Sequence, residues 1–457
     1  MAYKVVSLFS GCGGLDIGFK EIGFNLQYAC DIDPFAVECY RRNVDKNAFV
    51  RDVRDELFHN DIQMIGNTDI VLGGFPCQGF SKAGPKKPDD KRNTLYKEMK
   101  NTIQVLNPTI FIAENVDGLE QNFGGKIFNQ IFDDFSEIGY FVQYRIIDAV
   151  SFGVAQHRRR ILFVGIKDDI DTDFKWPIPT HSERLRNGDK KYENTIHKSI
   201  DKDNTLQKCR SISDVIGDLL SLSQPVFDHE VTNNWPSKYN YIFKRIKQGQ
   251  KLCNVRHSKT SVYTWEIPEA FGKVTKREVD ILNTIAKNRR LKKYGNKPNG
   301  NPLSISEIER LSGLSMITIE IMNLLSKGYL KEIDNKYDLK GAMFCSGLFK
   351  RPNWSEPSPT VLTNFHNPRY FLHPLMDRPF SARECARLQG FPDSFRFSWD
   401  DFFIPLEKRY KLIGNAVAAP VSRAMANAVK YFLRKLEIDN NETNDTSNDF
   451  IRMAIGI

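Results

Sequence analysis

The sequence predicts an α/β protein built on a doubly wound, parallel sheet. Short apolar runs alternate with helical segments over roughly the first 170 residues, which is the pattern of strands joined by crossover helices. Several apolar runs end in glycines or carboxylates, at the edge where open α/β sheets hold their ligands. The alternation stops near Trp176, so we expect an irregular second part after it.

Length and composition narrow the class of protein further. A chain of 457 residues with 41% hydrophobic residues predicts two or three packed domains. No apolar run is long enough to span a membrane, and the N-terminus shows no signal-peptide pattern. The eight cysteines are scattered without a Cys-x-x-Cys pair, which argues against both a disulfide scaffold and a zinc site. We therefore expect a cytoplasmic protein without a structural metal.

The positive charge is concentrated in the middle of the chain. The net charge is +9, yet residues 181–350 hold 30 Lys and Arg against 17 Asp and Glu, and the rest of the chain is slightly acidic. Phosphate neutralisation by basic side chains is the main source of non-specific affinity for nucleic acid. The basic middle thus indicates a polyanion-binding module, with a solvated lysine-rich surface as the alternative.

The first predicted strand leads into a glycine-rich turn. Residues 4–9 are β-rich, and Gly11, Gly13 and Gly14 follow before a helix that extends to about Ile22. Glycines and a helix N-terminus form the usual cradle for a nucleotide, although Asp16 stands where the third glycine of G-x-G-x-x-G belongs. The next two strands end at Asp31 and Asp52. We expect these carboxylates to bind the same ligand, rather than only to cap helices.

Candidate catalytic groups follow later strands. An apolar run within the stretch 70–81 predicts a strand before Phe75-Pro76-Cys77, and residues 109–113 predict another before Glu114. Most free cysteines are small buried hydrophobes, so Cys77 alone is weak support for a nucleophile. Glu114 is either a proton donor or a buried glutamate with a partner. Arg158 and Arg160 alternate on one face of the strand at 161–166, where they need anions or structural carboxylates.

Together, these motifs resemble those of cytosine-C5 DNA methyltransferases of the bacterial restriction-modification type. The matching segments appear in the family's order and comprise residues 9–15, 76–78, 114–116, 156–160, 383–392 and 414–417. The resemblance covers roughly the first 170 and the last 100 residues. It implies a Rossmann-like, S-adenosylmethionine-dependent methyltransferase sheet with an inserted target-recognition region.

The resemblance also implies a mechanism. The Cys77 thiolate would add to C6 of a flipped-out cytosine, and C5 would then accept the methyl group. Glu114 would hydrogen-bond N3 and the exocyclic amine, Arg158 would hold the pyrimidine O2, and Arg160 would support the site. By the same resemblance, the residues that bind S-adenosylmethionine are Phe9, Ser10, Gly11, Cys12, Gly13, Gly14, Leu15, Asp31, Ile32, Asp52, Val53, Pro76, Leu95, Asn415, Ala416 and Val417. No residue cluster calls for a metal, and the loop at 81–95 is the candidate for closing over the site.

The sequence divides into four parts on this interpretation. Residues 1–175 form the first part of the catalytic domain, 176–350 the target-recognition region, 351–438 the returning segment that completes the catalytic domain, and 439–457 a flexible tail. Within 276–340, three helical patterns and a hairpin resemble a winged helix-turn-helix, whose helix starting at Ser315 would enter the major groove. The alternative is a small helical subdomain that packs on the body.

The expected partner is double-stranded DNA. A cognate restriction endonuclease would act on the same site without a stable complex, and we expect a monomer that does not associate with membranes. One rival is an RNA cytosine-C5 methyltransferase of the same fold, and another is a DNA-binding regulator with a degenerate nucleotide fold. A dinucleotide oxidoreductase explains neither Cys77 nor the basic middle.

Overall fold

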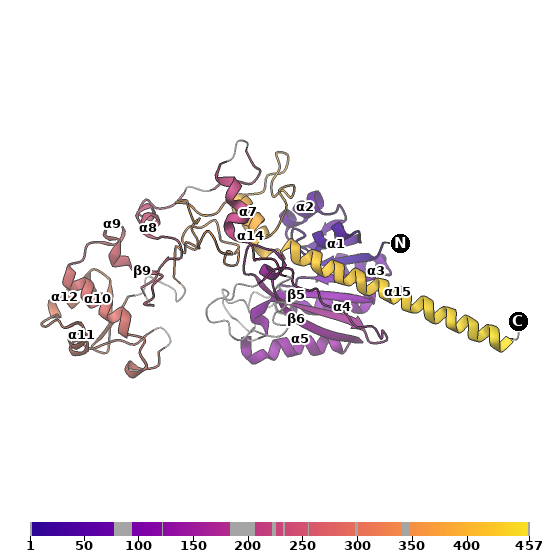
Figure 1. Ribbon diagram of the computed structural model, residues 1–457, viewed down its shortest axis with the longest axis horizontal. Coiled ribbons are helices and arrows are strands. Elements are labelled where there is room, and N and C mark those ends of the chain that lie inside the picture. The colour runs from indigo at the N-terminus through magenta and orange to yellow at the C-terminus, as the bar shows by residue number, and fades with distance from the viewer. Residues whose placement is uncertain are drawn as a thin grey trace. The chain divides into compact units, whose positions relative to one another are not determined.

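The chain forms two compact units in the computed structural model (Figure 1). The structure describes residues 2–76, 94–120, 122–182, 206–221, 225–231, 234–254, 256–297, 300–340 and 347–455, with side chains up to residue 439 except those of 122 and 123. Unit 1 comprises residues 1–228, 357–363 and 383–457, and unit 2 comprises 229–356 and 364–382. Among the described residues, no helix has the length and apolar character needed to cross a bilayer.

Unit 1 is built on a seven-stranded sheet with the order β3-β2-β1-β4-β5-β7-β6. Its first five strands pair in parallel, as their alternation with helices predicts. The strands are β1 (Lys4–Leu8), β2 (Asn25–Asp31), β3 (Ala48–Val50), β4 (Ile70–Gly73), β5 (Ile110–Val116), β6 (Tyr140–Asp148) and β7 (Arg159–Lys167). The carboxyl ends of β1, β2 and β4 therefore meet at one edge, where Leu8 pairs with both Cys30 and Gly73.

One strand, β7, departs from the expected all-parallel sheet. β7 is antiparallel to both of its neighbours, β5 and β6. The reason is the short link between β6 and β7, which spans 149–158. A parallel crossover needs a dozen or more residues and usually a helix, so this link can only return the chain antiparallel. The sheet is doubly wound but mixed.

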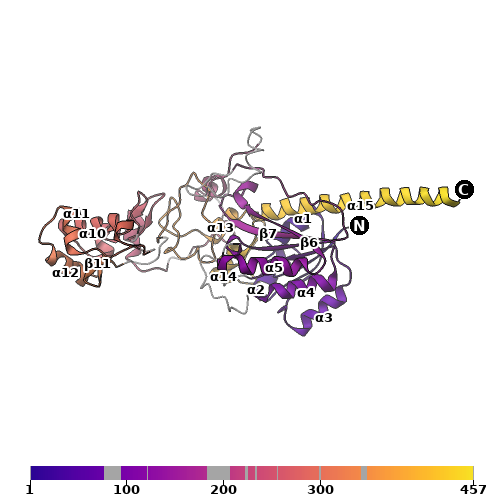
Figure 2. The same cartoon turned by 90° about the horizontal axis from the view of Figure 1, so that it is seen from below.

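Helices cover both faces of this sheet (Figure 2). On one face, α3 (Glu56–Ile65), α4 (Tyr96–Leu106) and α5 (Lys126–Ser136) contribute buried side chains such as Phe58, Met99 and Phe135 to the main apolar core. On the other, α1 (Asp16–Ile22) packs against α15 (Ala419–Ile455). The C-terminal helix thus completes the unit that the N-terminus begins. α15 continues beyond residue 438, where we expected the folded part to end.

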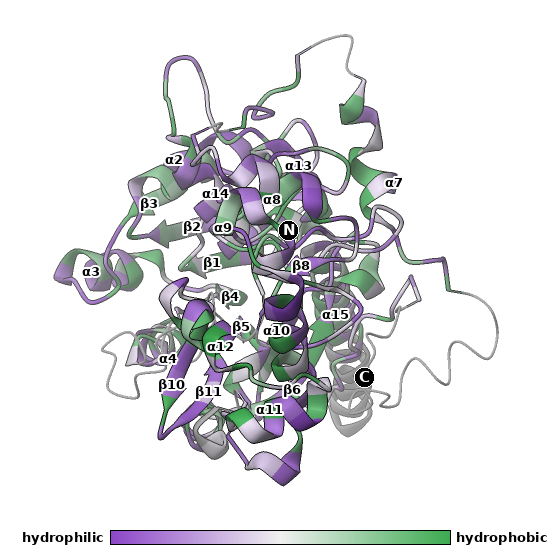
Figure 3. Ribbon diagram, turned by 90° about the vertical axis from the view of Figure 1, so that its left-hand side faces the viewer, coloured by the Kyte–Doolittle hydropathy of each residue, from purple (hydrophilic) through white to green (hydrophobic). Residues whose placement is uncertain are grey.

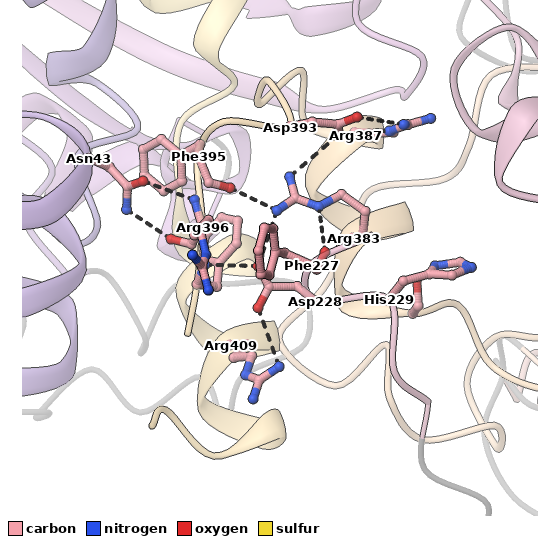
Figure 4. A network of polar contacts seen from close by, with 12 residues as sticks. Asn43, Phe227, Asp228, His229, Arg383, Arg387, Asp393, Phe395, Arg396 and Arg409 are labelled. Carbon is pink, nitrogen blue, oxygen red and sulfur yellow. Dashed lines mark hydrogen bonds and ion pairs between the residues drawn. The ribbon is translucent and has the colours of Figure 1, made fainter. Parts of the chain in front are cut away.

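The returning segment is fixed to unit 1 by a buried carboxylate. Asp228 accepts hydrogen bonds from Arg383 (3.1 Å), Arg409 (3.3 Å) and the backbone N–H of Phe397 (2.9 Å). Figure 4 shows Asp228 between the two guanidinium groups. Arg383 and Arg409 belong to α13 (Ala382–Leu388) and α14 (Leu406–Asn415). Arg383, the first residue of the motif segment 383–392, therefore has a structural role.

Unit 2 contains three helices followed by a hairpin. α10 (Lys276–Asn288), α11 (Ile305–Ser312) and α12 (Thr318–Ser326) precede the antiparallel strands β10 (Leu330–Ile333) and β11 (Lys336–Leu339), and they share one apolar core. Ser304 caps α11, since its hydroxyl accepts from the N–H of Glu307. Leu303 bridges to Tyr337, which ties the hairpin to the start of α11.

Shorter elements complete the described chain. Unit 1 also contains α2 (Pro34–Asn43) and α7 (Ile212–Ile216). The remaining elements of unit 2 are α8 (Tyr239–Arg245), β8 (Lys251–Leu252), β9 (Ser261–Val262) and α9 (Pro268–Phe271).

Candidate active site

A buried ion pair marks the end of β5. Glu114 lies in the register of β5 opposite Leu162, and Val116 lies opposite Arg160. Because the two strands are antiparallel, Arg160 on β7 reaches back to Glu114, and its Nε lies 2.8 Å from Oε1. Only 11% of the Glu114 side chain and 17% of the Arg160 side chain are exposed. The sheet register therefore brings together two residues that are far apart in the sequence.

Burial raises the pKa of the Glu114 carboxyl, and the positive charges of Arg160 and Arg158 only partly offset this effect. Desolvation disfavours the charged form of an acid, whereas nearby cations favour it. The carboxyl is thus more readily protonated than an exposed glutamate. That is the property expected of a group that donates a proton to a heterocycle.

Arg158 is more deeply buried than Arg160, and its terminal nitrogens donate hydrogen bonds to backbone carbonyls. Its two Nη atoms donate to the carbonyl oxygens of Val361 (3.2 Å) and Gly414 (2.9 Å). Its Nε is among the described buried side-chain atoms that lack a hydrogen-bond partner. Burial and the neighbouring Arg160 lower the pKa of Arg158. The guanidinium joins the strand to two segments from the C-terminal part of the chain.

The segment that leads to Cys77 passes next to the Glu114–Arg160 pair. A Cβ built on Gly74 would lie 3.5 Å from Oε2 of Glu114 and 3.9 Å from the carbonyl oxygen of Phe9. The Asn115 side chain donates to the carbonyl of Phe75 (3.1 Å), which fixes the segment that leads to Pro76. Cys77 itself and the loop up to residue 93 lie outside the described residues.

The glycine turn after β1 is tied to the end of β2. The N–H of Gly11 donates to one carboxylate oxygen of Asp31 and the N–H of Asp33 to the other, both at 2.9 Å. Burial raises the pKa of Asp31, while these two N–H groups favour its charged form. A carboxylate has about four lone-pair sites, so Asp31 keeps acceptor capacity for a ligand.

The residues that follow α14 pack against one side of the same turn. A Cβ on Gly14 would lie 2.6 Å from the carbonyl oxygen of Val417 and 2.8 Å from Cβ of Ala416. Only glycine permits this approach. Gly11, by contrast, has a φ of +55° and open space within 4 Å of where a side chain would project. The turn is packed on one side and open on the other, which suits a ligand that lies against backbone.

The other predicted ligand-binding residues lie around this edge in differing environments. Asp52 pairs with Arg54, which lowers the pKa of the Asp52 carboxyl. Ile32 and Asn415 are exposed, Val53 is buried, and Leu95 packs partly against the main core. The remaining members at this edge are Ser10, Cys12, Gly13 and Leu15, of which Ser10 donates to the carbonyl of Cys30 at 3.2 Å. Among the described residues, no cluster of His, Cys, Asp and Glu could hold a metal ion.

Comparison with known proteins identifies the family. The family model described as C-5 cytosine-specific DNA methylase matches residues 3–431. The chain belongs to this family. It is a DNA (cytosine-5) methyltransferase, as the sequence motifs predicted.

Individual relatives agree with the assignment. The chain is similar to type II methyltransferase M.BanI of Aneurinibacillus aneurinilyticus, with 31% identity over 92% of this chain and 94% of that protein. It is also 29% identical to type II methyltransferase M.HgiBI of Herpetosiphon aurantiacus, over 95% of this chain and 99% of the relative. A crystal structure of a putative DNA modification methyltransferase from an E. coli prophage shares the fold, with a TM-score of 0.51 and 21% identity over 95% of this chain and 100% of that chain.

Two buried glutamines support the methylase site without having been predicted as site residues. Gln156 donates to Gln389 and to the carbonyl of Leu388 (2.9 Å), and it accepts from the N–H of Val361 (2.9 Å). Gln389 in turn donates to the carbonyls of Ile413 (2.8 Å) and Ala416 (3.0 Å). The pair therefore links the start of β7 to the end of α14. Both glutamines lie in the matching segments 156–160 and 383–392, so the sequence did contain a signal for them.

Proposed function

We propose that this methylase acts through a covalent adduct between Cys77 and C6 of a cytosine that has left the double helix. The observation that carries the proposal is the buried Glu114–Arg160 pair, which lies against Gly74, three residues before Cys77. A carboxyl of raised pKa so close in the chain to Cys77 supports a site in which one base contacts both Glu114 and the thiolate.

Each residue then has a defined part in the reaction. The Cys77 sulfur forms a bond to C6 while Glu114 supplies a proton to N3, so C5 gains the electron density that it needs as a nucleophile. After methylation, C5 gives its proton to a base from solvent, the bond to Cys77 breaks with release of the thiolate, and N3 returns its proton to Glu114, which restores the neutral aromatic ring. A free thiol has a pKa of about 8.5, so nearby cations are needed to raise the thiolate fraction.

The two arginines differ in their contacts and therefore in their proposed roles. Arg160 orients the carboxyl of Glu114 and keeps part of its charge balanced. Arg158 is a positioning residue, because the carbonyls of Val361 and Gly414 occupy its Nη atoms. The role expected for Arg158 from the family, contact with the pyrimidine O2, requires its guanidinium to exchange one of these carbonyls for the base.

S-adenosylmethionine supplies an electrophilic methyl group when it is bound. The residues present suit it: the open side of Gly11, the remaining acceptor positions of Asp31 and the exposed amide of Asn415 lie around one edge of the sheet. Asp31 would accept from ribose hydroxyls, and the backbone of the glycine turn would lie against the ligand.

The biological setting follows from the relatives, which are named type II methyltransferases. We infer that the enzyme methylates a specific duplex sequence in the cytoplasm and thereby protects it from a restriction endonuclease that reads the same sequence. The family description names DNA, which favours this function over methylation of RNA.

Transfer of labelled methyl groups from S-adenosylmethionine to duplex DNA, followed by nucleoside analysis, tests the proposal. We expect 5-methylcytosine from the wild type and none from Cys77→Ser. As a folding control, Cys77→Ser should bind S-adenosylmethionine with unchanged affinity. Label in RNA but not in DNA, or an active Cys77→Ser variant, would contradict the proposal.

A further inference from the structure

The outer surface of α12 carries an unusual set of side chains, which we call the α12 face. Met316, Ile319 and Met322 are 86%, 73% and 51% exposed. Their spacing of three residues places them along one side of the helix and its leading turn. Exposed polar side chains flank them, namely Ser315, Thr318, Asn323 and Ser326.

The core of unit 2 determines which side of α12 faces outward. Ile317, Ile321 and Leu324 are fully buried and pack in the core shared with α10, α11 and the hairpin. These three residues occupy the opposite side of the helix. The packing of these three residues in the core therefore leaves the α12 face exposed to solvent.

The helix is also held rigidly at its start. α11 ends at Gly313 with a φ of +71°, and Glu309 of α11 accepts the backbone N–H of Ile317 at 3.2 Å. Arg277 of α10 donates to the carbonyl of Ser315 at 2.8 Å and pairs with Glu320. A helix, a tight turn and a second fixed helix form the scaffold on which helix-turn-helix proteins present side chains to DNA.

The side-chain types on the α12 face match those that contact some base pairs and not others. Arg and Lys are the usual readers of guanine, and Asp and Glu accept from cytosine. Within 315–326, all of which the structure describes, the single charged residue is Glu320, and Arg277 neutralises it. Apolar side chains instead contact the thymine methyl group, and Asn is the usual bidentate partner of adenine.

The unit that carries this neutral surface has a modest excess of basic residues. Residues 276–340 hold 13 Lys and Arg against 8 Asp and Glu. Glu278, Glu307, Glu320 and Asp338 each have a basic partner. On the hairpin, Lys336 and Lys340 are exposed, as are Glu332 and Asp334. In Figure 3 the strands β10 and β11 are largely in the purple of hydrophilic residues. Exposed basic side chains in the same unit, such as Lys292 and Lys293, are available to contact the phosphates that position a protein on DNA.

We propose that α12 lies in the major groove of the substrate duplex and reads A·T pairs, with Ile319 and Met322 against thymine methyl groups and Asn323 on adenine. This inference rests on the proposed function, because it assigns the sequence reading of the same DNA substrate. A protein partner fits less well, since stable protein interfaces bury about 800 Å² on each side and this stripe is one side chain wide.

The first test identifies the methylated sequence. The full chain is expressed in a bacterial host that lacks cytosine methylation, and genomic 5-methylcytosine is mapped at base resolution. The inference predicts at least one A·T pair at a fixed place in the recognised sequence. A recognised sequence composed only of G·C pairs would overturn it, whereas absence of 5-methylcytosine would instead contradict the proposed function.

The second test removes single methyl groups from the DNA. Each thymine of the recognised duplex is replaced in turn by deoxyuridine, and equilibrium binding is measured. Loss of one contacted methyl group should weaken binding by the wild type about fourfold at one or more positions. Ile319→Ala or Met322→Ala should bind the thymine and deoxyuridine duplexes equally at the position that it reads.

A matched control separates this contact from general effects. Leu291 is 44% exposed in the same unit but lies outside the α12 face, so Leu291→Ala should keep the full fourfold sensitivity to deoxyuridine. The inference is overturned if wild-type binding ignores every deoxyuridine substitution. It is equally overturned if Ile319→Ala and Met322→Ala remain as sensitive as the wild type.

Discussion

At the scale of single residues, Glu114 has the environment that most directly supports catalysis. Burial raises the pKa of its carboxyl, so the proton is present below that pKa and is lost as pH rises through it. Glu114→Gln can still hydrogen-bond the base but cannot donate a proton to N3. We expect methyl transfer in a single turnover to fall about 10²- to 10⁴-fold.

The pH profile provides a second readout of the same residue. Wild-type transfer should decline on the alkaline side as Glu114 ionises, whereas the residual activity of Glu114→Gln should lack that decline. Binding of S-adenosylmethionine to the variant checks that the fold is intact. Full activity of Glu114→Gln would show that the proton comes from elsewhere.

Asp16 shows how burial of a carboxyl affects stability. It is fully buried at the start of α1 and accepts from the hydroxyl of Tyr40 at 3.2 Å, and burial raises its pKa from 3.8 to about 6. Because the folded state holds the proton more tightly, this contribution to stability is complete below the unfolded pKa and is lost as pH rises through about 6.

Asp16→Asn should therefore gain stability relative to the wild type as pH increases. The difference should grow from near zero in mild acid to at most about 3 kcal/mol at neutral pH. Urea unfolding of both proteins at a series of pH values measures it. A difference that does not change with pH would refute the assignment.

At the scale of elements, Asp228 joins the returning segment to the rest of unit 1. It has a φ of +63°, a conformation that asparagine also tolerates well. Asp228→Asn thus removes, with little backbone strain, the carboxylate charge that the buried Arg383 and Arg409 share. We expect a loss of about 3–5 kcal/mol in the free energy of unfolding.

Asp401 is a suitable comparison for this prediction. It pairs with Arg42 at 2.8 Å, but 71% of its side chain is exposed. Asp401→Asn should lower the free energy of unfolding much less than Asp228→Asn does, because exposed pairs contribute little. If denaturant unfolding showed similar losses of stability in the two variants, Asp228 would not be the residue that holds the returning segment to unit 1.

The elements also show which features the sequence could predict. The parallel strands follow local periodicity, and β1 and β5 lie where the pattern indicated. The antiparallel β7 was not foreseen, because its direction depends on the length of a link and not on its own residues. Likewise, the contact between Glu114 and Arg160 depends on the register of β5 and β7, and the partners of Asp228 lie far along the chain.

At the scale of the whole molecule, the basic middle of the chain should determine the salt dependence of DNA binding. Lys292 and Lys293 are both exposed in unit 2. Replacing both by Ala should weaken binding and reduce the slope of log K against log salt by about 1 to 2, since each phosphate contact contributes about 0.9. Lys46→Ala in unit 1, also exposed, should leave the slope unchanged, and an unchanged slope in the double variant would show that these lysines do not contact phosphate.

The most direct test of the account is covalent trapping on duplex DNA that contains 5-fluorocytosine, in the presence of S-adenosylmethionine. Fluorine at C5 cannot leave as a proton does, so the enzyme should remain attached through Cys77. We predict a complex that survives denaturation with the wild type and is absent with Cys77→Ser. Trapping by Cys77→Ser, or no trapping by a wild type that still methylates ordinary cytosine, would contradict the proposed covalent mechanism.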